Sequence, residues 1–214
     1  MDTESVVSAV NVSRLQDVLR EMEMAGGPAC HGFRPGTAAL GGGCQSSVTV
    51  YERSPKFSYD RRLAMMREAE TRIDVMGIAN LALALHPDTA EVVRARNGGA
   101  LEIRILQCSP SNAGLMSMLG SRRADELGAI QDEIERAADA WRRIVDLPGL
   151  DLNLTIRRAQ ASLPMASALI TDKAVVATPY LRSKPTAESP TLHAAADDAY
   201  HAAMSEEFNL LWGE

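Results

Sequence analysis

Four side chains near the end of the chain are of types that could take part in a reaction. Ser167, Asp172 and Tyr180 lie within the stretch 162–182, and His193 follows it. A carboxylate, a hydroxyl and a phenol held together could serve a hydrolase or a lyase, and a histidine could move protons near neutral pH. Structural roles are also open to them: Asp172 could form a turn by bonding backbone amides, and His193 could face solvent. For these two residues the sequence favours the structural roles.

Two short strands must position these residues. The runs Ala166–Ile170 and Ala174–Ala177 are apolar and partly β-branched, and the polar pair Asp172 and Lys173 separates them. This pattern is typical of two neighbouring buried strands joined by a turn. It therefore predicts that Ser167 lies on the first strand and Asp172 in the turn.

The strand pair resembles the signature region of phospholipase D-like (PLD-like) proteins, whose active members carry His-x-Lys-x4-Asp. With Asp172 as the acid, the histidine position is Met165 and the lysine position is Ser167. The Gly-Ser-x-Asn that follows in the family falls on residues 179–182, Pro-Tyr-Leu-Arg. Phosphodiester chemistry needs an attacking imidazole, a proton donor and cations. A thioether and a hydroxyl supply none of these, so the resemblance implies a catalytically degenerate domain.

The resemblance extends from Val48 to Trp212. Small effector-type PLD-like domains of regulatory proteins lack the catalytic triad and end in a Ser-Pro turn and an aromatic helix. Here Ser189 and Pro190, then Phe208 and Trp212, would supply these parts. The resemblance implies a single PLD-like unit that pairs with a second copy to form a homodimer. It also implies a small-molecule pocket at the edge where the signature strands meet.

Polar residues also follow two other predicted strands, and they are expected at the same edge of the sheet. The segment Gln107–Gly114 follows a strand and opens a helix. Open α/β sheets bind ligands at the carboxyl ends of their strands. Ser109, Ser111 and Asn112 could therefore bind an anionic or polar small molecule, or they could form the helix N-cap, and the sequence favours neither. Asn80 follows the preceding strand and is expected at the same edge.

The resemblance completes the expected lining of this pocket with Met165, Ser167, Tyr180 and Arg182. Arg182 is the obvious partner for an anion in a lining that is otherwise mostly neutral. Met165 and Tyr180 could instead be core residues, and for Met165 the core is favoured.

The periodicity of the remaining chain predicts alternating strands and helices. The expected strands are 48–52, 72–78, 101–107 and 152–157, and the expected helices are 58–70, 88–97, 124–145 and 197–212. This order predicts an α/β fold in which a mixed β-sheet is flanked by helices. We expect it to form one domain over residues 48–214.

The segment before this domain has a different composition. Residues 1–25 are predicted to form an amphipathic helix, an N-terminal extension whose apolar stripe packs on the domain or in a dimer. Residues 26–47 form a glycine-rich linker or loop, and its Gly41–Gly43 run lacks the Lys-Ser/Thr of a phosphate loop. Cys30, His31 and Cys44 lie there without a fourth metal ligand. We expect no metal and no cofactor.

Composition narrows the class of partner. The 214 residues include 46% hydrophobic and 23% charged residues, which suits one globular core. A net charge of −6 disfavours direct nucleic-acid binding, because phosphate contacts require basic residues in excess. No apolar run approaches the roughly 20 residues of a membrane span, and the first residues are acidic rather than basic. A cytoplasmic protein without membrane contact is expected.

Adjacent arginines occur at 61–62, 122–123, 142–143 and 157–158. Most are expected to be solvated helix faces paired with nearby acids. If one pair is functional, Arg157 and Arg158 are favoured, because they end a predicted strand beside the hairpin.

Three functions remain open from the sequence. The first is a catalytically degenerate PLD-like domain that senses a small molecule or makes regulatory interactions. The second is a repurposed PLD-like enzyme, a hydrolase or lyase of a biosynthetic kind, that uses the same pocket. The third is an assembly or regulatory partner that binds through the predicted helix of residues 5–24. The sequence does not identify the ligand, and it does not decide whether the chain is an enzyme.

Overall fold

The computed structural model describes residues 48–54, 57–96, 101–120, 124–147, 151, 153–181 and 185–213, without the side chains of residues 120 and 124–126. All of them belong to the unit Gln45–Glu214. The predicted N-terminal helix 1–25 and linker 26–47 lie outside the described residues, and so does Arg182. Within the described ranges, no helix has the length and apolarity needed to cross a bilayer.

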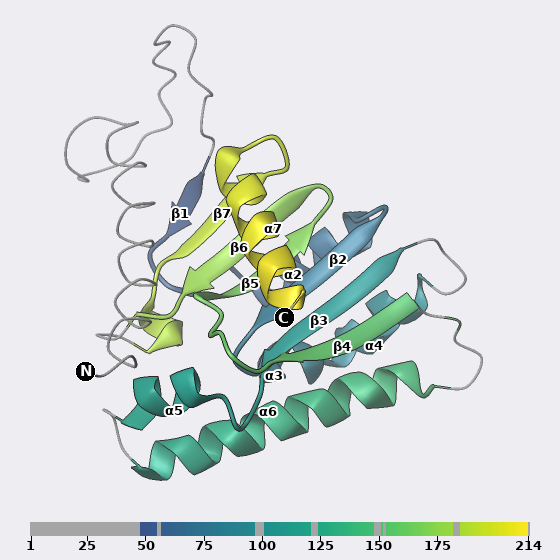
Figure 1. Ribbon diagram of the computed structural model, residues 1–214. Helices are drawn as coiled ribbons and strands as arrows, with labels where there is room; N and C mark the ends of the chain where they lie inside the picture. The colour runs from purple at the N-terminus through teal and green to yellow at the C-terminus, as the bar shows by residue number, and fades with distance from the viewer. Residues whose placement is uncertain are drawn as a thin grey trace, which may run out of the picture. The chain divides into compact units, whose positions relative to one another are not determined.

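The strands of the described residues form a seven-stranded sheet (Figure 1). In chain order they are β1 (Thr49–Tyr51), β2 (Arg72–Gly77), β3 (Glu102–Cys108), β4 (Asn153–Ala159), β5 (Ala166–Thr171), β6 (Ala174–Pro179) and β7 (Thr191–Ala195). Across the sheet they follow the order β1-β7-β6-β5-β2-β3-β4.

Strand direction changes between β2 and β5. The strands β2, β3 and β4 are parallel, whereas β5 pairs antiparallel with both β2 and β6, and β7 with both β6 and β1. Met76 near the end of β2 pairs with Ala168, and Ala166 at the start of β5 pairs with Pro179 at the end of β6. Residues that follow β2, begin β5 and follow β6 therefore meet at one edge of the sheet.

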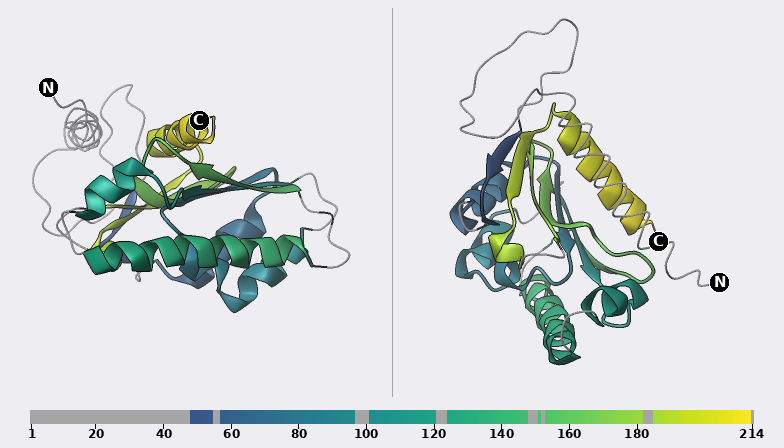
Figure 2. Two further views of the ribbon diagram at one scale, coloured as in Figure 1. Left: turned by 60° about the horizontal axis from the view of Figure 1, so that its bottom comes forward. Right: turned by 90° about the vertical axis from the view of Figure 1, so that its left-hand side faces the viewer.

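Helices cover both faces of the sheet (Figure 2). One face carries α2 (Tyr59–Glu68), α3 (Leu81–Ala84), α4 (Pro87–Arg94) and α6 (Ala124–Val145), and the other carries α7 (Ala199–Trp212). The helix α5 (Ala113–Gly120) packs on α6, and the short 3-10 helix η2 (Thr186–Glu188) lies between β6 and β7.

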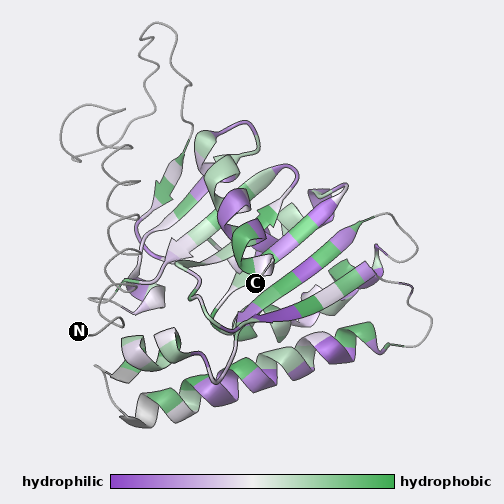
Figure 3. Cartoon of the chain, in the orientation of Figure 1, coloured by the Kyte–Doolittle hydropathy of each residue, from purple (hydrophilic) through white to green (hydrophobic). Residues whose placement is uncertain are grey.

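Alternation along the strands divides the apolar residues between the two faces. Figure 3 shows hydrophobic and hydrophilic residues alternating along β3. Ile73 and Val75 of β2 belong to the apolar cluster beneath α2, α4 and α6, while Met76 belongs to the cluster that contains Phe208 of α7. Two buried layers of this kind supply most of the stability of a three-layer domain, because each helix face and each sheet face removes apolar surface from water.

The long helix α6 has the bounds that its apolar spacing predicts, 124–145. Ile134, Ala137 and Trp141 recur at helical spacing, and none of the three has any solvent exposure. Trp141 belongs to the apolar cluster that includes residues of β3 and β4, whereas Ile134 and Ala137 belong to a cluster with Leu115 and Leu119 of α5. The amino-terminal half of α6 therefore lies beside α3 and α5, at the edge where β2 ends.

The predicted α/β class, with a mixed sheet flanked by helices, is confirmed. The strand β7 is not predicted by the sequence pattern; it is short and exists through its pairing with β1 and β6. The four-residue helix α3 is not predicted either. Neither segment is long enough to show a period of its own.

Candidate functional site

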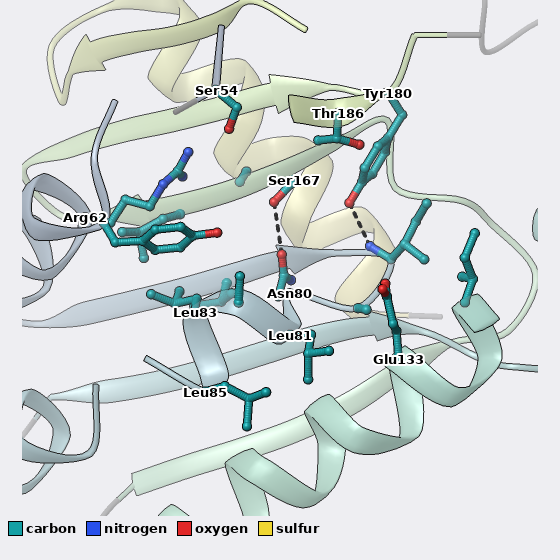
Figure 4. Close-up of a pocket in the computed structure, with 18 residues that line it drawn as sticks. Ser54, Arg62, Asn80, Leu81, Leu83, Leu85, Glu133, Ser167, Tyr180 and Thr186 are labelled. Carbon is teal, nitrogen blue, oxygen red and sulfur yellow. Dashed lines mark hydrogen bonds between the residues drawn. The ribbon is translucent and has the colours of Figure 1, made fainter. Parts of the chain in front are cut away.

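A pocket of about 450 Å³ opens at the edge where β2 and β6 end and β5 begins (Figure 4). This volume lies within the range of small-molecule sites. The lining residues come from α2, α3, α6, η2, the strands β2 and β5, and the loops that follow β1, β2, α3 and β6. They are Ser54, Tyr59, Arg62, Val75, Ile78, Ala79, Asn80, Leu81, Ala82, Leu83, Leu85, Ile130, Glu133, Ser167, Ala168, Leu169, Tyr180 and Thr186.

Three residues predicted from sequence meet in this pocket: Asn80, Ser167 and Tyr180. The Ser167 hydroxyl donates to Asn80 Oδ1 over 3.0 Å, and Tyr180 Oη accepts the backbone N–H of Ile78 over 2.9 Å. Figure 4 shows both hydrogen bonds inside the pocket. They join segments that are 87 and 102 residues apart in the chain, so the fold itself assembles this group.

The turn after β2 has a conformation that few residues adopt. Asn80 has φ 59° and ψ 28°, in the left-handed region, and is the non-glycine residue with positive φ among the described residues. Asparagine tolerates this region better than most side chains. Its amide nitrogen is buried and has no hydrogen-bond partner among the described residues. The preceding Ala79 carbonyl is fixed by Gln107 Nε2 over 2.7 Å.

Gly77 makes room for this arrangement. A Cβ at residue 77 would lie 2.6 Å from Asn80 Oδ1 and 2.8 Å from Tyr180 Oη. Side-chain atoms at such distances clash, so any larger residue would push the two polar groups away from each other. Glycine at the end of β2 therefore permits the close approach of Asn80 and Tyr180.

Tyr180 is partly buried and stays neutral. Burial raises the pKa of its phenol above the ordinary value, because the charged form would lose its hydration. The N–H of Ile78 acts in the opposite direction, but the net direction is upward. Tyr180 can therefore offer a hydrogen bond but cannot act as a base near neutral pH.

Arg62 also lines the pocket, contrary to the sequence prediction. The pair Arg61 and Arg62 was expected on a solvated helix face, yet Arg62 is only 8% exposed. Its guanidinium carbon lies 5.5 Å from the ring centre of Phe57 and 5.8 Å from that of Tyr59. Burial lowers the pKa of Arg62, but a guanidinium stays protonated at neutral pH. The described residues contain no carboxylate paired with it.

A sequence signal for Arg62 did exist. Arg62 precedes Met65 and Met66 by three and four residues, and both methionines are buried. Residues at these spacings share one face of a helix, so Arg62 belongs to the apolar face of α2 despite its charge.

Ser109, Ser111 and Asn112 do not line the pocket. Asn112 Oδ1 accepts the N–H of Leu115 over 2.9 Å, which caps α5. Its Nδ2 donates to the carbonyls of Ala159 and Ser162, so every hydrogen-bonding group of the side chain is used. Asn112 thus caps α5, whereas the hydroxyls of Ser109 and Ser111 form a hydrogen bond with each other over 3.0 Å.

Met165 immediately precedes β5 and is partly buried. Its carbonyl accepts the N–H of Tyr180 over 2.9 Å, which fixes the start of β5 against the end of β6. Its side chain is not part of the pocket lining. Ser167, two residues further along the chain, is part of the lining.

Asp172 lies at the opposite end of β5 from Ser167. Its Oδ1 accepts the backbone N–H groups of Glu70 and Thr71 over 2.9 and 3.3 Å, and that of Arg72 over 3.5 Å. The hairpin turn itself is closed by Thr171 Oγ1, which accepts from the two residues that follow Asp172. Asp172 therefore bonds backbone amides, but those of the chain that enters β2 rather than those of its own turn.

The two histidines near the last helix are not in the pocket either. His193 lies on β7, with its ring centre 5.3 Å from that of Phe57, and burial together with nearby Arg61 lowers its pKa. A lowered pKa keeps its imidazole neutral near pH 7. His201 Nε2 lies 2.8 Å from the carbonyl oxygen of Thr171.

Arg157 and Arg158, the favoured arginine pair, make structural contacts. Arg157 donates to the carbonyl of Trp212 over 2.8 Å and lies over its ring, and Arg158 forms an ion pair with Glu135 over 2.5 Å. Both therefore tie the edge strand β4 to neighbouring helices, away from the pocket lining.

No protein-family model and no curated protein sequence matches this chain. Solved structures with a similar fold include TrmBL2, an archaeal chromatin protein that binds DNA, at 19% identity and a TM-score of 0.44. This match covers 99% of the present chain, which spans only 65% of the length of TrmBL2.

Two further similar structures are Nuc from Salmonella typhimurium, a phospholipase D family member, and NucT from Helicobacter pylori. Nuc matches at 16% identity and a TM-score of 0.43, covering 79% of this chain and 95% of its own. NucT matches at 11% identity and a TM-score of 0.42, covering 79% and 97%. Likeness at this level assigns neither a family nor an activity to the present chain.

Proposed function

We propose that the described domain is a catalytically inactive PLD-like module that binds a small molecule in this pocket and serves a sensing or regulatory role. One observation carries the proposal: the polar groups of the pocket are arranged to bind and not to react. Ser167 donates its proton to the amide oxygen of Asn80, which is not a base. Tyr180 Oη accepts a hydrogen bond from the backbone N–H of Ile78.

A reacting hydroxyl requires a base within hydrogen-bonding reach. The described lining residues include no histidine, cysteine or lysine. Their carboxylate, Glu133, is exposed on α6, and no hydrogen bond joins it to Ser167. Asp172 and His193, the other catalytic candidates, lie outside the lining. This distribution supports binding over the alternative of a repurposed hydrolase or lyase.

The sequence resemblance supports the same proposal. Ser167 occupies the position of the motif lysine and lies in the pocket wall. A pocket that keeps its place while losing its reactive groups is what a degenerate PLD-like domain would have. The expectation that net charge disfavours direct nucleic-acid binding stays a prediction.

The test uses the full chain purified from its own host. Native mass spectrometry should detect a retained small molecule, and adding that molecule should raise the Tm in a saturable manner, since a ligand at about 100 times its Kd stabilises by roughly 2.7 kcal/mol. Hydrolysis of a generic phosphodiester, bis(p-nitrophenyl) phosphate, should stay at background.

The matched variants are Ser167→Ala in the pocket and Ser111→Ala outside it. Loss of ligand binding in the first alone supports the proposal. Phosphodiester turnover that disappears in Ser167→Ala and persists in Ser111→Ala would instead establish the repurposed enzyme.

A further inference from the structure

Arg62 differs from the other buried arginine, Arg104, in having no carboxylate partner among the described residues. Arg104 is 9% exposed and forms a bidentate pair with Asp74, at 2.7 and 2.8 Å. Arg62 is 8% exposed and has no such partner among the described residues. An uncompensated buried charge costs several kcal/mol, so an anion at this place would be stabilised strongly.

The surroundings of Arg62 hold the guanidinium in place without neutralising it. The rings of Phe57 and Tyr59 lie within cation–π distance. Aromatic faces attract a cation but leave its N–H donors available to a ligand. Figure 4 shows the guanidinium extending toward Ser54, and Arg62 is part of the pocket lining.

The rest of the pocket is largely apolar. Leu81, Leu83 and Leu85 of the α3 segment and Ile130 of α6 contribute to its wall. Glu133 carries a negative charge on the opposite side of the pocket from Arg62 (Figure 4). A ligand with a second negative charge would be repelled there, whereas a hydrocarbon body would be accommodated.

We propose that the pocket binds a small monocarboxylic acid with an apolar body. The carboxylate accepts hydrogen bonds from Arg62, whose planar fork matches two carboxylate oxygens. The hydrocarbon part packs against the leucines of the α3 segment. This inference rests on the proposed binding function and adds the chemical class of the ligand.

The full chain is titrated separately with hexanoate, hexanamide and inorganic phosphate. Binding is measured from the NMR chemical shifts of the backbone amides of residues 78–80 and 167. Hexanoate should shift these resonances, and hexanamide should bind about tenfold more weakly or less, because it lacks the charge that Arg62 recognises. Phosphate should bind more weakly than hexanoate, because it has no apolar body.

Two variants that remove the same charge from α2 provide the control. Arg62→Met should weaken hexanoate binding by about tenfold or more and leave hexanamide unchanged, while Arg61→Met, at an exposed position, should stay within about twofold of wild type. If Arg62→Met does not fold, the comparison of hexanoate with hexanamide on the wild-type chain decides.

The outcomes separate the two proposals. The carboxylate assignment is wrong if hexanoate and hexanamide bind with equal affinity, or if millimolar hexanoate shifts no resonance. A retained ligand of another class would still support the binding function. If phosphate binds as tightly as hexanoate, the ligand does not need an apolar body and that part of the proposal is wrong. The binding function itself fails only if native mass spectrometry and ligand screening find no occupant of the pocket.

Discussion

Asp172 serves the fold by accepting hydrogen bonds from backbone amides. It accepts three backbone N–H groups where the chain enters β2. Burial raises the pKa of Asp172, but these amides outweigh that effect, and the net direction is downward. Because the pKa is lower in the folded state, ionised Asp172 stabilises the fold above the ordinary aspartate pKa of about 3.9. That contribution is lost as the pH falls through the lowered pKa.

The replacement Asp172→Asn should therefore lower the Tm at pH 7 by a few degrees, since the variant keeps an acceptor oxygen but loses its charge. The difference from wild type should stay constant between about pH 5 and 8 and shrink below about pH 4. Thermal unfolding followed by circular dichroism across this range measures it. Asp139→Asn, which removes an exposed ion pair with Arg142, is the control and should have little effect. A pH-independent difference would contradict the assigned role.

At the scale of elements, a buried polar group under α7 fixes that helix to the sheet. Asp74 of β2 pairs with Arg104 of β3, and Arg104 also donates to Asn209 of α7 over 3.1 Å. The Arg104 guanidinium lies 4.7 Å from the ring centre of Phe208 and 5.4 Å from that of Trp212. The α7 layer is thus held by specific contacts as well as by apolar burial.

The variant Arg104→Met should lower the free energy of unfolding by about 3 kcal/mol, because it leaves the Asp74 carboxylate buried with only Arg72 beside it. Urea denaturation measures this loss. The double variant Asp74→Leu with Arg104→Met should recover most of the stability, since apolar side chains can replace a buried pair at little cost. A double variant as unstable as the single one would show that the packing of Arg104 on Phe208 and Trp212 matters more than its charge.

At the scale of the whole molecule, the sheet brings together segments that are distant in the chain, and its edges set how copies could associate. The edge strands of the described sheet are β1 and β4, whereas β5 and β6 are interior. A homodimer formed where the signature strands meet would therefore use the ends of these strands and their following loops, not strand-to-strand pairing. This surface lies next to the pocket, at the edge that carries Tyr180.

The homodimer stays a prediction with a direct measurement. Light scattering of the full chain during size-exclusion chromatography should give twice the mass of one chain, and the mass should persist at high salt if the contact is apolar. Deleting residues 1–25 distinguishes the two possible contacts: a dimer that survives uses the α/β domain, and one that dissociates uses the N-terminal segment. A single-chain mass for the full protein would rule out both.

Much of the fold follows from local pattern alone. Helix α6 and the strands β2, β3, β5 and β6 show their periods in the sequence, because each is long enough and has a uniform environment along one face. The meeting of Asn80 and Ser167 was also predictable, since residues at strand ends of one sheet share an edge. The strand β7 could not be predicted, because its five residues depend on partners elsewhere in the chain.

The sequence by itself determined the strand pair around Asp172 and the α/β class. Only the tertiary structure decided which polar groups have partners. Helical spacing places Arg62 on the apolar face of α2, but only the packing of that helix against Phe57 and Tyr59 leaves its charge without a carboxylate partner among the described residues. The sequence allows Asn112 to be a ligand or a cap, and in the structure both its amide oxygen and its amide nitrogen bond backbone groups of the protein. Burial and hydrogen bonding depend on contacts between distant segments, and a local pattern does not contain them.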